Sequence, residues 1–258
     1  MMRCRKWRRW RPSRLAPLCV LWLLCGPAYA TEPAAPRPKY GPQAERLFLA
    51  REYVREHEAP DFWALLGYYL PQQDDRSCSV ASAAMLLNGL RADAALSAAD
   101  ELVTQDALLE RVASPIWNAG VAPDGPGVSL DQFAVLLEQA LDEYEIAGRV
   151  ELAHIERADE AALRDLREVL AANEASAGDF LIANFLQSEF TGDPDGAVGH
   201  MAPVAAYDAA ADRVLIFDPD RRWYEPYWVS VETFLAGMAT RDPAGGRARG
   251  YLRVMRAE

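Results

Sequence analysis

Cysteine and histidine are scarce in this chain, whose 258 residues include four cysteines and three histidines. Cys4, Cys19 and Cys25 lie in an N-terminal segment typical of export signals, so Cys78 is the only cysteine of the expected mature chain. An internal disulfide is therefore excluded, although an exported protein meets an oxidising compartment. Paired His or Cys spacings typical of a metal site are absent, as is a glycine-rich phosphate loop. We predict neither a bound metal nor a cofactor.

Long apolar runs are also absent. The longest, Leu15 to Cys25, spans 11 residues and is shorter than the roughly 20 that a membrane-spanning helix needs. It follows a basic segment and precedes the small-residue pattern Ala28-Tyr29-Ala30. The sequence thus predicts a signal peptide over residues 1–30, cleaved near Ala30, and a soluble periplasmic or secreted protein. The pair Arg8-Arg9 leaves the Sec and twin-arginine routes both open.

Basic residues are few outside the signal. That segment holds seven of the 27 Lys and Arg and no Asp or Glu, so 20 basic residues face 38 acidic ones in the mature chain, a formal net charge of −18. Such a charge repels nucleic acid and anionic membranes, and we predict neither as a partner. Residues 31–40 are rich in proline and are expected to form a linker, and residues 41–258 are long enough for one domain.

Helical periodicity dominates the first half of that domain and strand patterns the second. Helices are expected at residues 45–57, 62–70, 80–90, 158–172 and, after a capping box at Ser129, up to Leu141. Strands are expected at residues 180–185, 200–207, 213–217, 227–230 and 250–255. This order predicts an α+β fold in which the helix after Cys78 packs against the sheet.

Cys78 lies where a polar loop leads into a helix of small residues. A thiol attacks a carbonyl carbon as its thiolate, and the N–H groups at a helix N-terminus stabilise that anion. We therefore interpret Cys78 as a nucleophile. On residue frequencies alone, however, a cysteine beside alanines is more often part of the core.

A thiol nucleophile needs a base, which His200 and Asp218 are placed to provide. His200 begins one predicted strand and Asp218 follows the next, so a tight turn would bring them together. The imidazole would exchange a proton with the thiol while the carboxylate holds its tautomer. Gln72, six residues before Cys78, would join the Cys78 amide in binding the oxyanion. Taken singly, these residues could be a satisfied strand histidine, a turn-forming aspartate and an exposed loop amide.

The two other histidines are weaker candidates. His57 lies among charged residues on a helix expected to face solvent, and no acidic residue after a strand is positioned to pair with His154.

These residues resemble the catalytic domain of the phytochelatin synthase family, papain-like enzymes that act on glutathione. The resemblance runs from about Phe62 to Arg256. It rests on several blocks of the sequence: Gln72 through Cys78, Ala81-Ser82, Met85 through Leu90, Gly127 through Leu130, Gly199 through Pro203 with Tyr207, Asp218, Arg221, Tyr224, Pro226, Trp228-Val229, and Arg249 through Tyr251.

The resemblance implies a papain-like fold and a role for each site residue. Cys78 would be the nucleophile, His200 the base, Asp218 its orienting carboxylate and Gln72 the oxyanion donor. Three further residues are implied to bind substrate: Arg221, Tyr224 and Arg249. Arg221 could instead buttress the site. The alternative role of Arg249 is a surface ion pair, and that of Tyr224 is packing.

The chain departs from the family pattern at three positions. Ser79 replaces a usual glycine, Ala202 a common serine and Glu225 a common proline. The cysteine-rich C-terminal extension of the plant enzymes is also absent. In this respect the chain resembles the short bacterial members, in which cleavage of glutathione tends to dominate over polymer synthesis.

The expected function is cleavage of the Cys-Gly bond of glutathione through a γ-glutamylcysteinyl thioester. Water or a second glutathione then takes the acyl group, giving γ-Glu-Cys or phytochelatin. Whether heavy metal bound to the substrate thiol changes the rate is left open, and a homodimer is one of the oligomeric states left open. Two alternatives are a peptidase of the double-glycine leader type and an inactive relative that binds a thiol peptide.

Overall fold

The computed structural model describes residues 40–41, 43–92 and 100–257. The expected signal peptide and all but the last residue of the expected linker lie outside these ranges. No helix within them is both long and apolar enough to cross a bilayer.

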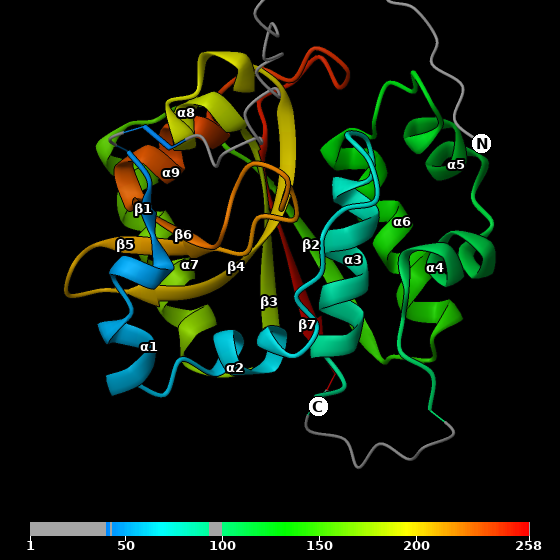
Figure 1. Ribbon diagram of the computed structural model, residues 1–258, viewed down its shortest axis with the longest axis horizontal. Helices are drawn as coiled ribbons and strands as arrows, with labels where there is room; N and C mark the ends of the chain where they lie inside the picture. Colours follow the sequence, from blue (N-terminus) through cyan, green and yellow to red (C-terminus); the bar gives the residue numbers. More distant parts are fainter. Residues whose placement is uncertain (1–39, 42, 93–99, 258) are drawn as a thin grey trace, which may run out of the picture. The chain divides into compact units, whose positions relative to one another are not determined.

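The strands of the described chain form one antiparallel sheet in the order β1-β6-β5-β4-β3-β7-β2 (Figure 1). Their bounds are β1 Glu45–Arg46, β2 Gly148–His154, β3 Asp179–Leu186, β4 Gly199–Asp208, β5 Arg213–Ile216, β6 Tyr227–Ser230 and β7 Gly250–Arg256. The five predicted strands are confirmed as β3 to β7. The mixture of helices with an antiparallel sheet confirms the α+β prediction.

Helices cover both faces of the sheet (Figure 1). Their bounds are α1 Glu52–Glu56, α2 Pro60–Leu66, α3 Cys78–Gly89, α4 Gln105–Val112, α5 Pro115–Val121, α6 Leu130–Glu143, α7 Glu160–Glu174, α8 Gln187–Thr191 and α9 Val231–Met238. The protein has two hydrophobic cores, and alternate residues of β3 belong to one or the other. In the first core Phe180 and Ile182 pack with α2, α3 and α6, and in the second core Leu181 and Ala183 pack with α7 and α9.

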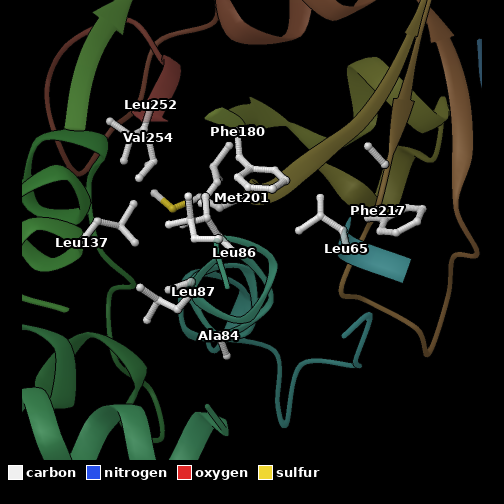
Figure 2. Close-up of a cluster of buried hydrophobic side chains, with 14 of the residues drawn as sticks. Leu65, Ala84, Leu86, Leu87, Leu137, Phe180, Met201, Phe217, Leu252 and Val254 are labelled. Atoms are coloured by element: carbon white, nitrogen blue, oxygen red, sulfur yellow. The ribbon is translucent and has the colours of Figure 1, made fainter. Parts of the chain in front are cut away.

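Helix α3 is the central helix of the first core. All of its residues after Cys78 are buried, and Ser82 donates a hydrogen bond of 3.1 Å to the Met201 carbonyl of β4. Figure 2 shows Leu86 of α3 pointing toward Met201 and Phe180 of the sheet. This packing, expected from the sequence, fixes the N-terminus of α3 relative to β4.

One predicted helix is wrong. Residues 45–57 form β1, a 3-10 turn at Leu47–Leu49 and the short helix α1. Pairing with β6 outweighs helix propensity here, because Glu45 lies opposite Trp228 and the Leu47 amide donates to the Pro226 carbonyl at 2.8 Å. The helix predicted over residues 62–70 instead starts at Pro60, whose fixed φ suits a first helical turn, and ends at Leu66.

A buried carboxyl links α2 to α7. Asp61 is fully buried and accepts a hydrogen bond from the Asn173 side chain, while Oδ1 of each residue has no partner in the described chain. Burial raises the pKa of Asp61 well above its ordinary value, and the charges of Glu174 and Asp179 raise it further. The folded protein therefore holds a proton here that the unfolded chain releases above about pH 4.

Asparagine at Asp61 should stabilise the fold at neutral pH. A carboxyl whose pKa is raised by folding makes the free energy of unfolding fall as the pH rises above its unfolded pKa. Asp61→Asn removes this proton uptake, so its free energy of unfolding should exceed the wild-type value by roughly 1–3 kcal/mol near pH 7.5 and converge with it near pH 4. Urea unfolding at both pH values measures the difference, with Asp142→Asn on the exposed face of α6 as the control. An unchanged pH dependence in Asp61→Asn would contradict the assignment.

Candidate active site

Cys78 is the first residue of α3, and Ser77 precedes it at the N-cap position. The Ser77 hydroxyl donates to the Asp74 carbonyl at 3.1 Å and accepts from the Asp74 amide at 2.9 Å, which closes the loop before the helix. The cap side chain makes no bond to the first-turn amides of α3. These N–H groups lack acceptors within the helix and favour negative charge beside the half-buried thiol.

His200 and Asp218 meet because β4 and β5 are paired. His200 is the second residue of β4, and Asp218 lies two residues beyond the end of β5. The Phe217 amide donates to the Pro203 carbonyl at 3.0 Å, which extends the pairing to the residue before Asp218. Both side chains are buried, and His200 Nε2 lies 2.7 Å from Asp218 Oδ1.

The Cys78 side chain lies close enough to the imidazole to contribute to the raised pKa of His200. Because Nε2 is engaged by Asp218, the remaining nitrogen, Nδ1, is the one left for the thiol. The structure thus brings three of the four predicted catalytic residues together, in the order Cys78, His200, Asp218.

Electrostatics in this series favour an imidazolium. Burial alone would lower the pKa of His200, but the charge of Asp218 and the hydrogen bonds with Asp218 and Cys78 raise it well above its ordinary value. Burial alone would raise the pKa of Asp218, yet the His200 charge and the hydrogen bonds to the carboxylate hold it below its ordinary value. The pair therefore carries opposite charges at neutral pH.

A cleft of about 690 Å³ opens beside the thiol, within the range of small-molecule sites. Its lining includes the predicted residues Gln72, Cys78, His200, Tyr224 and Arg249. Its other charged residues are Asp75, Asp193, Asp195, Asp220, Asp242, Arg76 and Arg241. No group of three or more His, Cys, Asp or Glu side chains in the described ranges is arranged to hold a metal ion.

Unpartnered polar atoms are concentrated in this cleft. Six buried side-chain atoms in the described chain have no hydrogen-bond partner, and three of them belong to cleft residues: Gln72 Oε1, Asn184 Oδ1 and Arg249 Nε. Buried polar groups are normally paired, so such atoms need an explanation. Three residues of the cleft lining therefore carry buried polar atoms that are not paired within the described chain.

Gln72 lies at the edge of the cleft, and its backbone amide donates to the Pro219 carbonyl at 2.8 Å, directly after Asp218. This bond ties the loop before α3 to the segment that carries the carboxylate. The side-chain oxygen of Gln72, Oε1, has no hydrogen-bond partner within the described residues. The Nε2–H₂ group of the same side chain is the donor that an oxyanion at the thiol would need.

Alanine at Gln72 should lower kcat about 10²- to 10³-fold with little change in KM, because it removes a donor to the oxyanion that forms only during the reaction. Steady-state kinetics on the substrate proposed below measures this. The control is Gln73→Ala in the same loop, whose side chain bonds to Asp106 and does not line the cleft. Equal losses in the two variants would argue for a loop effect and against oxyanion binding.

Comparison with known proteins bears on this site. A family model described as Phytochelatin synthase matches residues 40–251 of the chain. The chain belongs to the phytochelatin synthase family.

Curated relatives carry the same name across species. Glutathione gamma-glutamylcysteinyltransferase 3 of Lotus japonicus is 26% identical over 213 residues, which cover 82% of this chain and 40% of that protein. Glutathione gamma-glutamylcysteinyltransferase 1 of Triticum aestivum is 26% identical over 214 residues, which cover 83% of this chain and 39% of that protein. The chain thus spans about two fifths of the length of these relatives.

The three residues that the phytochelatin synthase resemblance implies in substrate binding are placed differently. Arg249 and Tyr224 are buried and line the cleft. Arg221 does not line it: the guanidinium lies 5.3 Å from the ring centre of Tyr69 and donates to the Tyr224 carbonyl at 2.7 Å. This geometry corresponds to the buttressing alternative for Arg221.

Departures from the phytochelatin synthase pattern have structural partners. Ser79 is buried, and its hydroxyl accepts a hydrogen bond of 3.0 Å from the indole of Trp117 in α5. Glu225 forms a two-pronged ion pair with Arg46 of β1, with its shorter contact at 2.5 Å. Ala202 lies in the apolar second core, where a serine hydroxyl would need a partner.

His154 has an acidic partner, contrary to the sequence-based argument against it. Its Nε2 lies 3.3 Å from Asp131 Oδ2 at the start of α6, and its Nδ1 lies 2.6 Å from the Ala248 carbonyl. The sequence argument considered only aspartates that follow strands and so missed one on a helix. His154 does not line the cleft that contains Cys78, so the pair does not compete with His200.

Proposed function

We propose that this protein is an exported, papain-like thiol enzyme that cleaves the Cys-Gly bond of glutathione. The observation that carries the proposal is the placement of Cys78 beside the hydrogen-bonded pair of His200 and Asp218, in a cleft that both Cys78 and His200 line. Family membership and relatives named glutathione gamma-glutamylcysteinyltransferase support glutathione as the substrate.

The reaction begins with the thiolate of Cys78 and the imidazolium of His200. The thiolate attacks the cysteinyl carbonyl carbon, and the carbonyl oxygen becomes an oxyanion held by the Cys78 amide and Gln72. When the C–N bond breaks, His200 gives its proton to the departing glycine nitrogen. The product on the enzyme is a γ-glutamylcysteinyl thioester.

Neutral His200 then acts as a base in the second half of the reaction. It takes a proton from water, whose oxygen attacks the thioester and releases γ-Glu-Cys, or from the amino group of a second glutathione, which yields phytochelatin. Asp218 keeps the imidazole oriented in both halves. No cofactor takes part in these steps.

The cleft has mixed charge, with five aspartates and three arginines along its lining. Glutathione carries one ammonium and two carboxylate groups, so it requires both signs. Arg249 is the buried arginine of this lining, and its guanidinium lies 3.7 Å from Asp242 and donates to the Arg241 carbonyl. Burial and the neighbouring Asp218 raise the pKa of Asp220, which weakens the acidic character beside the thiol.

The deciding experiment incubates the purified protein with glutathione under reducing conditions and follows the products by mass spectrometry, with Cys78→Ala as the background. γ-Glu-Cys plus glycine would establish hydrolysis, and longer (γ-Glu-Cys)-Gly chains would establish transfer. Parallel reactions with cadmium measure the effect of thiol-bound metal. Intact glutathione with cleavage of a double-glycine leader peptide would establish the peptidase alternative, and no turnover of either would favour the inactive relative.

A further inference from the structure

The Asp218 carboxylate is held from both sides. Oδ1 accepts from His200 Nε2 at 2.7 Å and from the Asp220 amide at 2.8 Å. Oδ2 accepts from the Tyr227 hydroxyl at 2.8 Å and, at 3.5 Å, from Gln187 Nε2. Tyr227 is thus the one short contact that Oδ2 makes with the described residues.

We infer that Tyr227 is a positioning residue, whose hydroxyl holds the Asp218 carboxylate in the orientation that keeps His200 aligned with Cys78. The inference rests on the proposed function as far as turnover is concerned. The alignment itself can be tested on the thiol without any substrate. Neither the sequence blocks that carry the family resemblance nor the predicted site included this residue.

The hydroxyl can serve this purpose because the Tyr227 ring has little freedom. Tyr227 is fully buried as the first residue of β6, where it pairs with Ile216 on one side and Arg46 on the other. The rings of Tyr40 and Tyr224 pack edge-on against it, with centres 5.8 Å and 6.1 Å away. A fixed donor near a buried carboxylate restricts the rotation of that carboxylate, and a small misplacement of a catalytic group can cost up to about 10²-fold in rate.

A simpler role for the contact is that a buried tyrosine hydroxyl has found the nearest acceptor. Both roles predict some loss of stability on replacement by phenylalanine. The two roles predict opposite changes in the pKa of His200: a carboxylate that turns away stabilises the imidazolium less, whereas one that stays in place and only loses the Tyr227 donor becomes more basic and stabilises it more. The pH dependence of thiol reactivity separates the two.

The experiment measures alkylation of Cys78 by iodoacetamide from about pH 4 to about pH 10 in wild type and Tyr227→Phe. In wild type the pairing with Asp218 keeps a positively charged imidazolium beside the thiol. Tyr227→Phe should lower the alkylation rate near pH 6 about tenfold and move the alkaline limb of kcat/KM to lower pH. The kcat for glutathione should fall about 10- to 100-fold with KM little changed.

Tyr53→Phe is the matched control, since Tyr53 also donates to a carboxylate, that of the half-buried Glu174 at 2.9 Å, but lies outside the cleft. It should leave the alkylation profile unchanged. In an Asp218→Ala background, Tyr227→Phe should have no further effect, because no carboxylate remains to be held.

An unchanged alkylation profile in Tyr227→Phe, or an equal loss with and without Asp218, would overturn the inference. If wild type fails to cleave glutathione while the alkylation shift appears, the proposed function fails and the positioning role stands. If wild type cleaves glutathione and the alkylation shift is absent, the proposed function stands and the positioning role of Tyr227 fails.

Discussion

Glutamine at His200 should lower the kcat for glycine release by a factor on the order of 10⁶, the loss seen when a catalytic base is removed from a triad. Glutamine is the informative replacement because its Nε2–H₂ can still donate to Asp218, whose buried charge would otherwise lose a partner. The side chain keeps the hydrogen bond but cannot accept or return a proton. The measurement is the rate of glycine release by the purified variant, compared with Cys78→Ala as the floor.

The fold of His200→Gln serves as its control. Its unfolding midpoint should stay close to that of wild type, and the cleft should keep its volume. A variant that is folded and retains more than about one hundredth of wild-type activity would show that another group moves the proton.

The raised pKa of His200 also sets the pH range of the wild-type enzyme. The reactive form needs the imidazolium, so kcat/KM should persist above pH 6.5 and fall only when the pH passes the raised pKa of His200. The raised pKa of His200 also affects stability. The Asp218–His200 interaction contributes fully to the free energy of unfolding below about pH 6.5, and its contribution is lost as the pH rises through the folded-state pKa of His200. An alkaline limb at or below pH 6.5 would contradict the Asp218–His200 pairing.

The placement of Cys78, His200 and Asp218 could be predicted because each residue depends on a local pattern. Cys78 precedes a run of small residues typical of a buried helix. His200 and Asp218 lie at the open end of the hairpin that β4 and β5 form, opposite its tight turn. One strand pairing is enough to bring the last two together. Their contact with Cys78 needed only the further packing of α3 on β4, which the apolar content of both elements indicates.

The supporting residues could not be predicted because they depend on the register of distant segments. Tyr227 reaches Asp218 only through the pairing of β5 with β6, and one residue of slip would turn it to the other face. Ser79 departs from the family pattern, and its partner Trp117 lies 38 residues away on α5, a short helix that was not predicted although Ser114-Pro115 is a helix-start pattern. Strand β1 was hidden for the same reason, since it exists only as the partner of β6.

Replacing Asp218 should separate orientation from charge, with alanine costing about 10⁴-fold in kcat and asparagine less, since Cys-His-Asn enzymes work with an amide at this position. Asparagine can place its oxygen at the Oδ1 position, where it still accepts from His200 and the Asp220 amide, so the imidazole stays aligned. It loses the negative charge, and the pKa of His200 should then fall and move the alkaline limb of kcat/KM to lower pH. Alanine loses both functions.

The comparison requires pH–rate profiles of glycine release for both variants and the unfolding midpoints of each. The interactions that lower the pKa of Asp218 stabilise the fold above about pH 4, and this stabilisation is lost as the pH falls through the folded-state pKa. The unfolding midpoints of wild type and Asp218→Asn should therefore differ least in acid. If asparagine were as damaging as alanine, charge would be the main contribution of Asp218. In that case Tyr227, which orients the carboxylate without changing its charge, would have little left to contribute, so the two experiments constrain each other.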